Sequence, residues 1–386
     1  MAMAEASRLT MPQFLSEVRA TSPEFAIEKA NVEGSRARAS GIRINAPMIG
    51  YMQMKDGSGT NHGLEIAQEI PFPTKISQTK KVRDLELEAQ LESSQLQEVS
   101  LLAEARAAYV AFWSAYARLN IQKEKHDWLI HHVKITRTTS WSDTAAKIHL
   151  LEVETDADLV ENEVLALESD LVEKRNGLKI YAPGIKVDDL IPVEPPLIPI
   201  KYDKHSPSLL VTLREKELHA KEALVGLQKQ AYAPDLFVRL RSYNGNESAP
   251  RSQELMVGIS VPFLYFWQPK AEVAEASAQR MKAQAELQKS KIDLDGRFSS
   301  LVKKAESTQA QIKNLKEKLI PRSERQAKLV RNLSQRTMEG LDEHKKVMLG
   351  LLDLRIRVIE LRVAYEELTK NIMKLTGVTS VEESSK

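Results

Sequence analysis

The chain lacks cysteine and is poor in aromatic residues. None of its 386 residues is cysteine, and Phe, Trp and Tyr together make up 5%. The missing cysteine excludes disulfide scaffolds, thiolate metal sites and thiol nucleophiles. Few aromatic residues, together with 42% hydrophobic and 28% charged residues, are typical of long helices that pack on one another.

Long hydrophobic runs and an excess of one charge are also missing. No run of about 18 apolar residues occurs, so we expect no helix that crosses a bilayer. The 55 basic and 53 acidic residues leave a net charge of +2, whereas a nucleic-acid-binding protein is expected to carry a strongly basic face. We therefore expect no nucleic acid among the partners.

The start of the sequence carries no secretory signal of the usual kind. A positively charged start and an apolar core of about 7–15 residues are both missing before Leu9. We therefore expect either a cytoplasmic chain or a mature chain whose natural start has been replaced by residues 1–4. Without cysteine, an N-terminal lipid anchor is not expected either.

Glycine and proline are absent from residues 74–176, which predicts long helices there. Apolar residues in this segment recur at alternating steps of three and four, as in Leu102, Ala105, Tyr109, Phe112, Tyr116 and Leu119, and again in Leu150, Val153, Ala157, Val160, Val164, Leu167 and Leu171. Such a repeat predicts coiled-coil packing. We expect helices over 74–140 and 145–180, joined by a hairpin tip at 138–143.

The second half of the sequence repeats this plan. A heptad stripe predicts a helix over 269–338, with a kink at Pro321; its members are Leu294, Phe298, Leu301, Ala305, Thr308, Ile312, Leu315 and Leu319. A tip at 337–342 leads into a return helix over 342–376. The apolar stripes of the two return helices coincide when 197 is subtracted from the second, so the halves share a register.

The shared register indicates an internal duplication. We predict a first structural repeat over 8–184, a second over 206–377 and a tail over 378–386. A linker over 185–205 holds Pro192, Pro195, Pro196 and Pro199, which predicts a semi-rigid connector without helix. The second repeat opens with a helix over 208–231.

Each repeat also contains one predicted β-hairpin, over 46–70 and over 235–261. The second hairpin shows the alternation of a half-buried strand, with Leu236, Val238 and Leu240 in one strand and Leu255, Val257 and Ile259 in the other. The segment 55–59, Lys-Asp-Gly-Ser-Gly, is a turn signal for the first hairpin. Each strand is about ten residues long, the length that crosses a bilayer at a tilt.

Four such strands cannot close a barrel alone, because about eight is the smallest number known in membranes. An open sheet would present unpaired edges, so we expect several copies of the chain to share one barrel. The helices favour the same arrangement. Ala103, Ala107, Ala111 and Ala115 repeat along a second face of the first long helix, and a helix with two packing faces has a neighbour on each side, as in a closed ring.

The order of short helix, hairpin, long helix, tip and return helix, present twice, resembles the TolC-like outer-membrane efflux protein family. Residues 9–15 followed by 22–25 resemble the family's opening helix and turn. Residues 63–75, GLEIAQEIPFPTK, resemble its strand-to-helix motif, and residues 257–263, VGISVPF, the second copy. The Pro-Phe-Pro-x-Lys form is most similar to the heavy-metal efflux branch. The resemblance covers residues 8–377.

The resemblance implies a mainly α fold with a small β part, in which three copies form an α-barrel tunnel in the periplasm and a shared 12-stranded β-barrel in the bacterial outer membrane. The implied partners are two further copies of the chain, outer-membrane lipid, a periplasmic adaptor and an inner-membrane transporter. The implied function is conduction of exported small molecules or metal ions, without catalysis and without a cofactor. The alternatives are a soluble coiled-coil scaffold and a periplasmic adaptor protein, although neither explains two ten-residue strand pairs at equivalent places.

Several residues are candidates for channel sites. The family commonly carries acidic residues at the tips of the return helices, whereas His149 and Lys345-Lys346 stand at the corresponding positions here. Asp143, Asp342 and Glu343 stand nearby and would supply charge to the entrance, unless they are ordinary solvated helix caps. Ser142, Gly340 and Leu341 belong to the predicted tips and to the partner contact. The entrance set is therefore Asp143, His149, Asp342, Glu343 and Lys346.

Other residue groups allow two interpretations. The aromatic residues Phe263, Tyr265, Phe266 and Trp267 suit the membrane interface, or a hydrophobic plug under a turn. The residues Met48, Met52 and Met54 share one strand face and would suit a soft metal, although an apolar wall is the simpler interpretation. The spacing of His126, His131 and His132 does not stack two imidazoles, so no metal site is predicted. The motifs GxGxxG, GxSxG and HExxH are absent, so no enzyme is expected.

Overall fold

The computed structural model describes residues 8–41, 44–56, 59–139, 144–186, 190–198, 208–244, 251–260, 264, 267–334 and 338–378. The chain divides into two compact units. We call residues 1–27, 96–208 and 293–386 the helical unit, and residues 28–95 and 209–292 the sheet unit. Each unit contains segments of both predicted repeats, so the division at 8–184 and 206–377 stays a prediction about the sequence.

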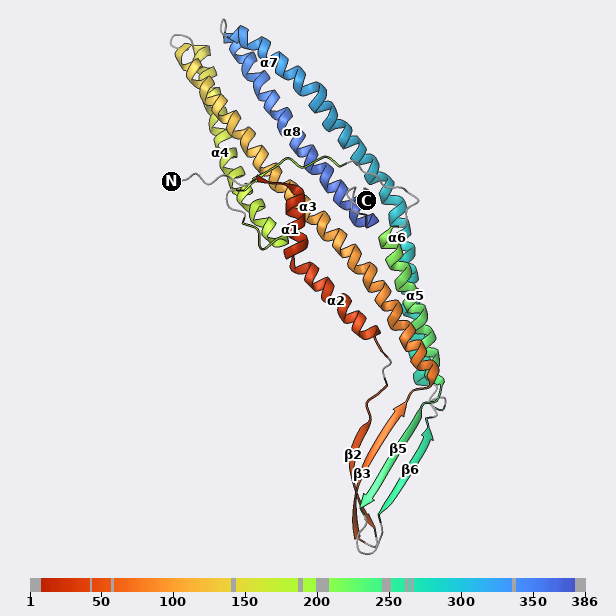
Figure 1. The fold of residues 1–386 in the computed structure, drawn as a ribbon. Helices are drawn as coiled ribbons and strands as arrows, with labels where there is room; N and C mark the ends of the chain where they lie inside the picture. The colour runs from red at the N-terminus through yellow and green to blue at the C-terminus, as the bar shows by residue number, and fades with distance from the viewer. Residues whose placement is uncertain are drawn as a thin grey trace. The chain divides into compact units, whose positions relative to one another are not determined.

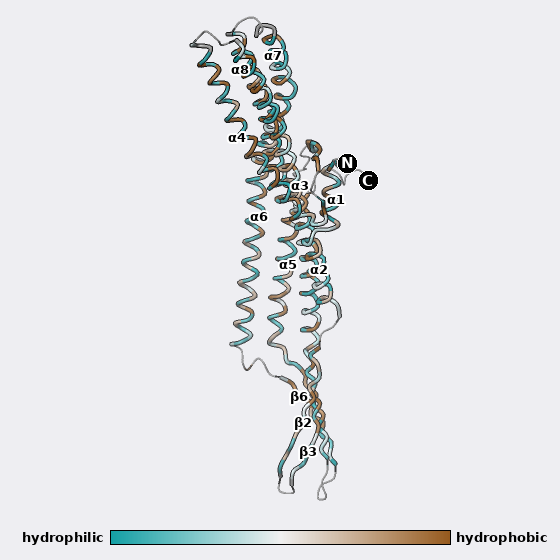
Figure 2. The backbone as a smooth tube through the Cα atoms, turned by 90° about the vertical axis from the view of Figure 1, so that its left-hand side faces the viewer, coloured by the Kyte–Doolittle hydropathy of each residue, from teal (hydrophilic) through white to brown (hydrophobic). Residues whose placement is uncertain are grey.

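Helices make up most of the described chain (Figure 1). They are α1 (Met11–Thr21), α2 (Pro23–Ala39), α3 (Pro73–Thr139), α4 (Thr144–Tyr181), α5 (Leu209–Lys229), α6 (Trp267–Asn314), α7 (Ile320–Ser334) and α8 (Met338–Thr376). None of the helices in the described residues combines the length and the hydropathy that a helical membrane crossing requires. Instead, apolar and polar residues alternate along the long helices in Figure 2.

The predicted hairpin tips differ from the structure in their bounds. Helix α3 continues to Thr139, and residues 140–143 of the first tip lie outside the described residues. The second tip, predicted at 337–342, is wrong in extent because α8 begins at Met338. Glu339 in the first turn of α8 interacts favourably with the helix dipole.

The helix predicted over 269–338 is interrupted by a π-helical turn, Leu315–Leu319, rather than by a kink alone. Pro321 follows this turn and removes one backbone hydrogen bond of a regular α-helix. A π turn inserts one extra residue, which rotates everything beyond it. Ala327 and Val330 are therefore buried, whereas Leu319 is 37% and Leu329 70% exposed. The assignment of Leu319 to the buried stripe is wrong for this reason.

The core of the helical unit consists mainly of residues from α1, α3 and α4. Phe14, Tyr109, Phe112 and Leu178 are fully buried there. A second cluster joins α6 to α8 along the predicted heptads and includes Phe298, Ala305, Ile312, Val358, Leu361 and Tyr365. On another side of α3, Ala103 packs with Met373 of α8. Helix α3 therefore packs on more than one face, and its small residues allow the close approach.

Residues 190–198 of the proline-rich linker are described and belong to the helical unit. Its strand β4 (Ile191–Pro192) pairs in parallel with β1 (Arg8–Leu9). The Tyr109 hydroxyl donates to the Leu9 carbonyl at 2.7 Å, and burial raises the pKa of Tyr109 to about 12, so the hydroxyl remains a donor. On α8, the Tyr365 hydroxyl donates to the Ile198 carbonyl at 2.5 Å. Two buried tyrosines therefore fix the linker.

A buried ion pair connects α3 to α8. The Arg106 guanidinium donates two hydrogen bonds to the Glu366 carboxylate, and both side chains are less than 8% exposed. Arg362, which is also buried, donates to the Pro195 carbonyl and lies 5.7 Å from the centre of the Trp113 ring. Burial lowers the pKa of Arg362. The buried Glu366 carboxylate therefore lies near two buried guanidinium groups, those of Arg106 and Arg362.

Substitution of Glu366 tests this ion pair. We expect Glu366→Gln to lower the free energy of unfolding by about 3 kcal/mol, because removing one partner leaves a buried charge uncompensated. Chemical denaturation measures the loss. The matched control is Glu367→Gln, since Glu367 is 54% exposed and pairs only with Lys370 in the next turn; there the loss should stay below about 0.5 kcal/mol. Equal losses in both variants would contradict the assignment.

The sheet unit contains one antiparallel sheet of four strands (Figure 1). The strands are β2 (Met48–Asp56), β3 (Gly59–Ile70), β5 (Leu236–Asn244) and β6 (Ser252–Ile259), in the order β2-β3-β5-β6. The two predicted hairpins therefore pair with each other through β3 and β5. The predicted turn at 55–59 is too long, because Lys55 pairs with Thr60 and Asp56 with Gly59; a two-residue connection suits the twist of a hairpin.

Candidate functional site

The four-stranded sheet has two chemically different faces. Successive side chains of a strand point to opposite faces, and the registers fix which residues of neighbouring strands share a face. Ile49 lies opposite Ile66, Ile66 opposite Leu240, and Leu240 opposite Leu255. One row of four aliphatic side chains therefore crosses the whole sheet.

The face that carries this row, here called the apolar face, is exposed in the single chain. Nine of its large apolar residues are 40–74% exposed, namely Ile49, Tyr51, Leu64, Ile66, Leu236, Leu240, Leu255, Val257 and Ile259. Among the described strand residues, no carboxylate lies on this face, and Lys55 near the β2–β3 turn is its only lysine or arginine. A contiguous exposed apolar surface of this kind indicates contact with lipid or another protein.

The opposite face, here called the charged face, carries an ion-pair network. The Glu65 carboxylate lies 2.7 Å from Nε of Arg241 and 3.2 Å from Nε of Arg239. Arg241 also reaches Glu254 at 3.7 Å. Met48, Met52 and Met54 share this face, as the alternation predicts. Their interpretation as part of an apolar wall is wrong, because the apolar wall is the other face.

Asp235 fixes the junction between the sheet and the first long helix. Its carboxylate accepts a hydrogen bond from the Phe72 backbone N–H at 3.0 Å and from the Lys75 ammonium at 2.7 Å. The backbone N–H of Asp235 donates to the Ser260 hydroxyl at 2.8 Å. The Pro-Phe-Pro-x-Lys motif therefore supplies a lysine that pairs with an aspartate at the start of the second hairpin.

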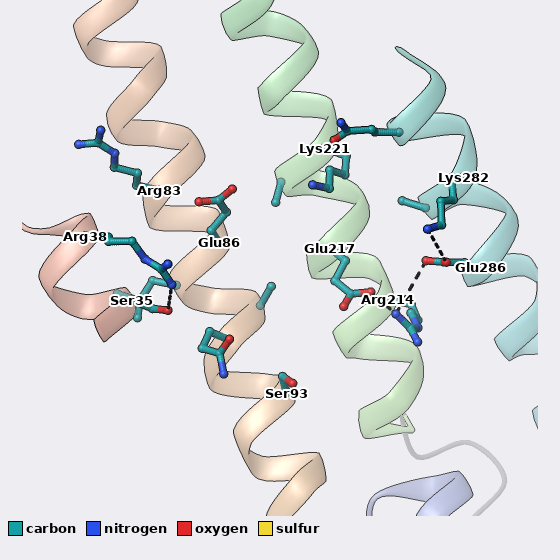
Figure 3. Close-up of a pocket in the computed structure, with 16 residues that line it drawn as sticks. Ser35, Arg38, Arg83, Glu86, Ser93, Arg214, Glu217, Lys221, Lys282 and Glu286 are labelled. Atoms are coloured by element: carbon teal, nitrogen blue, oxygen red, sulfur yellow. Dashed lines mark hydrogen bonds and ion pairs between the residues drawn. The ribbon is translucent and has the colours of Figure 1, made fainter. Parts of the chain in front are cut away.

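A polar groove of about 690 Å³ lies between α2, α3, α5 and α6 in the sheet unit (Figure 3). The Arg214 guanidinium lies 2.6 Å from the Glu217 carboxylate and 3.9 Å from that of Glu286, and the Lys282 ammonium also lies 3.9 Å from Glu286. These charges compensate one another. The groove has the character of a hydrated wall between helices rather than of a catalytic site, which needs a nucleophile or a base within reach of a substrate.

The predicted entrance residues lie in the helical unit. Asp342, Glu343 and Lys346 are exposed on α8. Because α8 begins at Met338, the two acidic residues follow its first turn and are not N-caps. His149 on α4 is largely buried, which does not suit a residue that faces an open entrance. Lys345 is also largely buried and pairs with Asp156 of α4 at 3.2 Å.

The remaining predicted site residues are two buried residues, one exposed tryptophan and several residues outside the described part of the chain. Gly340 and Leu341 are buried in the first turn of α8. Trp267 begins α6 and is 58% exposed. Asp143 and Ser142 of the first tip, and the aromatic residues Phe263, Tyr265 and Phe266, lie outside the described residues.

A histidine cluster near the ends of α3, α4 and α8 was not predicted. The His132 ring stacks on Trp128 with centroids 5.0 Å apart, and His149 approaches it edge-on at 6.0 Å. His344 of α8 lies against the other side of the tryptophan at 5.6 Å. Burial, followed by the nearby charges of His149, Lys345 and His344, lowers the pKa of His132 to about 4. His132 is therefore neutral at pH 7.

The pH dependence of stability tests the buried state of His132. Its stabilising contribution is fully present above pH 6.5, the ordinary histidine pKa, and is lost as the pH falls towards 4, since protonation then favours the unfolded chain. We expect the wild type to lose about 2 kcal/mol more than His132→Gln on acidification from about pH 7 to pH 5. Denaturation at both pH values measures this difference. His131→Gln, at an exposed neighbour, should follow the wild type, and parallel pH profiles for wild type and His132→Gln would refute the assignment.

Two sequence signals could have identified the groups that were missed. Trp128 and His132 are four residues apart, a spacing that places them on one helix face. Arg239 and Arg241 alternate with apolar residues in β5, which places both guanidinium groups on one face of a strand. The partner carboxylate Glu65 becomes recognisable only when the β3–β5 register is known.

The described residues contain no group of three His, Asp or Glu side chains with the geometry of a metal site. His126 lies 3.7 Å from Asp127, and His149 of the histidine cluster lies 3.8 Å from Glu152. Neither arrangement resembles a carboxylate dyad or a nucleophile with its base.

Comparison with known proteins finds matches in structure but not in sequence. No family model and no curated protein matches the sequence. The fold is similar to that of the CmeC outer membrane channel of Campylobacter jejuni, with a TM-score of 0.76 and 12% identity over 95% of this chain and 85% of the other. The outer membrane protein VceC of Vibrio cholerae matches with a TM-score of 0.74 and 14% identity, covering 95% and 96% of the two chains.

A third similar structure is the open state of the MtrE outer membrane channel of Neisseria gonorrhoeae, with a TM-score of 0.74 and 13% identity over 95% of this chain and 88% of the other. Identities of this size establish the fold alone. The predicted mainly α fold with a small β part, similar to the TolC-like channels, is thereby confirmed for the single chain.

Proposed function

Because the chain has the fold of the TolC-like outer-membrane channels, we propose that it is the outer-membrane channel of a tripartite efflux system. The observation that carries this proposal is the sheet with one apolar and one charged face. In a transmembrane β-barrel the strands alternate between lipid and a polar interior. The apolar face would contact the outer-membrane lipid, and the charged face would line the channel.

The free edges of the sheet support a trimer. Strands β2 and β6 each pair on one side only within the described chain, and unpaired edges are unfavourable in lipid because backbone groups there lack water. In the proposed homotrimer, β6 of one copy pairs with β2 of the next, and three sheets of four strands close one 12-stranded barrel. The strands of 8–12 residues match the length that crosses a bilayer at a tilt.

The long helices provide the second half of the proposed channel. Helix α3 has 67 residues and packs on more than one side, as expected of a tunnel wall. In the proposal, three copies form this tunnel in the periplasm, and a periplasmic adaptor and an inner-membrane transporter deliver small molecules or metal ions to its open end. The channel catalyses no reaction and needs no cofactor. A soluble scaffold or an adaptor has no use for the exposed apolar sheet face, which argues against both.

Two neighbouring residues of β2 distinguish the lipid-facing side from the channel side. Ile49 lies on the apolar face and Met48 on the charged face, and both are about two-thirds or more exposed in the single chain, at 74% and 68%. We expect Ile49→Lys to reduce outer-membrane assembly strongly, because a lysine facing lipid costs about 2–4 kcal/mol near the bilayer centre. The yield of folded trimer in outer-membrane fractions is the measurement.

Met48→Lys is the matched control for Ile49→Lys. A lysine at position 48 would face the water-filled interior, on the side that carries Glu65 and Glu69, so the trimer yield should be close to that of the wild type. Equal losses in the two variants would contradict the assignment of the faces. A wild-type chain that fractionates as a monomer outside the membrane would contradict the proposed channel itself.

We further propose that the ends of α4 and α8 form the channel entrance and the adaptor contact. Exposed Asp342 and Glu343 would act with Asp143 and Lys346 as charges at the entrance, while His149 would support their position from its buried site. Ser142, Gly340 and Leu341 belong to the tips that would meet the adaptor. At the other end of the tunnel, Phe263, Tyr265, Phe266 and Trp267 would lie at the membrane interface, which favours aromatic side chains.

Single-channel recording tests the entrance charges. We expect the double variant Asp342→Ala/Glu343→Ala to lower cation preference, since three copies lose six negative charges at one end of the pore. The matched control is Glu367→Ala on the same helix, an exposed carboxylate outside the proposed entrance. Unchanged conductance and ion preference in the double variant would show that the two residues are ordinary solvated surface charges.

A further inference from the structure

A cavity of about 510 Å³ lies between α3, α7 and α8 in the helical unit. Of its lining residues, only Leu341 has a role in the proposed channel function. Its polar lining consists of Trp128, His131 and His132 from α3, Lys328 and Arg331 from α7, and His344 from α8. The rest of the lining is aliphatic or a methionine side chain. The volume is within the range of small-molecule sites, which are mostly apolar with a few placed polar groups.

The charge of this lining has one sign. Two permanently basic residues and three imidazoles line the cavity, while no carboxylate does so among the described residues. Asp342 interacts with His132 through its charge, but neither Asp342 nor Asp156 lines the cavity. Asp156 pairs with Lys345, and Asp342 at the start of α8 is exposed. A cavity with positive or protonatable groups only is electrostatically suited to an anion.

His132 supplies a buried polar atom without a partner. The residue is 2% exposed, and Nε2 has no hydrogen-bond partner among the described residues. Most buried polar atoms are paired, so an unpaired one calls for an explanation. The Trp128 ring stacked on His132 provides an adjacent flat apolar surface. A polar donor and an aromatic wall therefore meet in one cavity.

We propose that this cavity binds a small organic carboxylate with an apolar body. The carboxylate accepts a hydrogen bond from the His132 imidazole, and the apolar body packs against Trp128 and the aliphatic lining. Lys328 and Arg331 add favourable charge at the cavity wall. The inference does not rest on the channel function, because it follows from the cavity alone.

Other ligand classes fit the cavity less well. A bare inorganic anion would leave the aliphatic and aromatic lining without contacts, and that lining accounts for much of the available binding energy. A neutral apolar molecule would leave the buried His132 nitrogen unpaired, as it is in the free protein, and would gain nothing from the basic residues of the lining. A metal ion would need three imidazoles around one point, and no group of three His, Asp or Glu side chains in the described part of the chain has that geometry.

Binding should be coupled to proton uptake. In the free protein, burial and the surrounding cations lower the pKa of His132. The groups that face it are His131 on its own helix, His149 on α4, Lys328 and Arg331 on α7, and His344, Lys345 and Asp342 on α8. A bound carboxylate supplies the missing negative charge and raises that pKa. The carboxylate therefore binds more tightly as the pH falls.

Isothermal titration of the full-length, detergent-solubilised protein with 2-naphthoate tests the proposal. We expect saturable binding that is tighter at about pH 5.5 than at about pH 8 and is accompanied by proton uptake, seen as a dependence on the ionisation enthalpy of the buffer. The neutral analogue 2-naphthalenemethanol should bind at least about tenfold more weakly, as expected from the loss of a charge-assisted hydrogen bond.

Three variants complete the test. His132→Gln should weaken binding of 2-naphthoate about tenfold and abolish proton uptake, and Lys328→Gln, at an exposed position that does not endanger folding, should weaken binding several-fold. His126→Gln, on α3 but outside the cavity, should leave binding unchanged. Absence of binding, equal affinity for the neutral analogue, or wild-type affinity and proton uptake in both His132→Gln and Lys328→Gln would overturn the proposal.

Discussion

The buried Arg106–Glu366 pair is the interaction on which the helical unit depends most. It joins α3, from the first half of the sequence, to α8, from the second, at a depth where an unpaired charge is very unfavourable. The neighbouring Arg362 and Tyr365 of α8 extend this contact to the linker by binding the Pro195 and Ile198 carbonyls. Residues 362–366 of α8 therefore bind both α3, from the first half of the sequence, and the linker between the two halves.

Much of the fold could be predicted from the sequence, because its signals are local and periodic. The absence of glycine and proline over 74–176, the heptads and the strand alternation predict helices and strands close to those observed. These local signals could not predict the contacts between residues that are far apart in the sequence. Glu65 meets Arg241 only through the β3–β5 register, and Glu366 meets Arg106 across 260 residues. The extra residue of the π turn before Pro321 could not be predicted either, because a π turn leaves no clear signal in the amino-acid composition.

The candidate sites show the same division. Exposed charges such as Asp342 and Glu343 are recognised from their place near a predicted tip, because a helix end is a local feature. The histidine cluster needs three helices to meet, so the spacing of its members in the sequence does not reveal it. The two faces of the sheet could be predicted only in part. Alternation alone groups Met48, Met52 and Met54 on one face, but the chemistry of that face depends on Arg239 and Arg241 from the other half of the sequence.

The π-helical turn at Leu315–Leu319 also affects how this helix can change during evolution. One residue corresponds to a rotation of about 100° in a helix, so the extra residue of the turn sets the angular position of everything that follows in α7. Deletion or insertion of a single residue there would rotate the fifteen residues of α7 as a body and present a different surface, without altering their sequence. The end of the helix can thus acquire a new binding face through a change in length alone, while the packing of α6 against α8 before the turn is preserved.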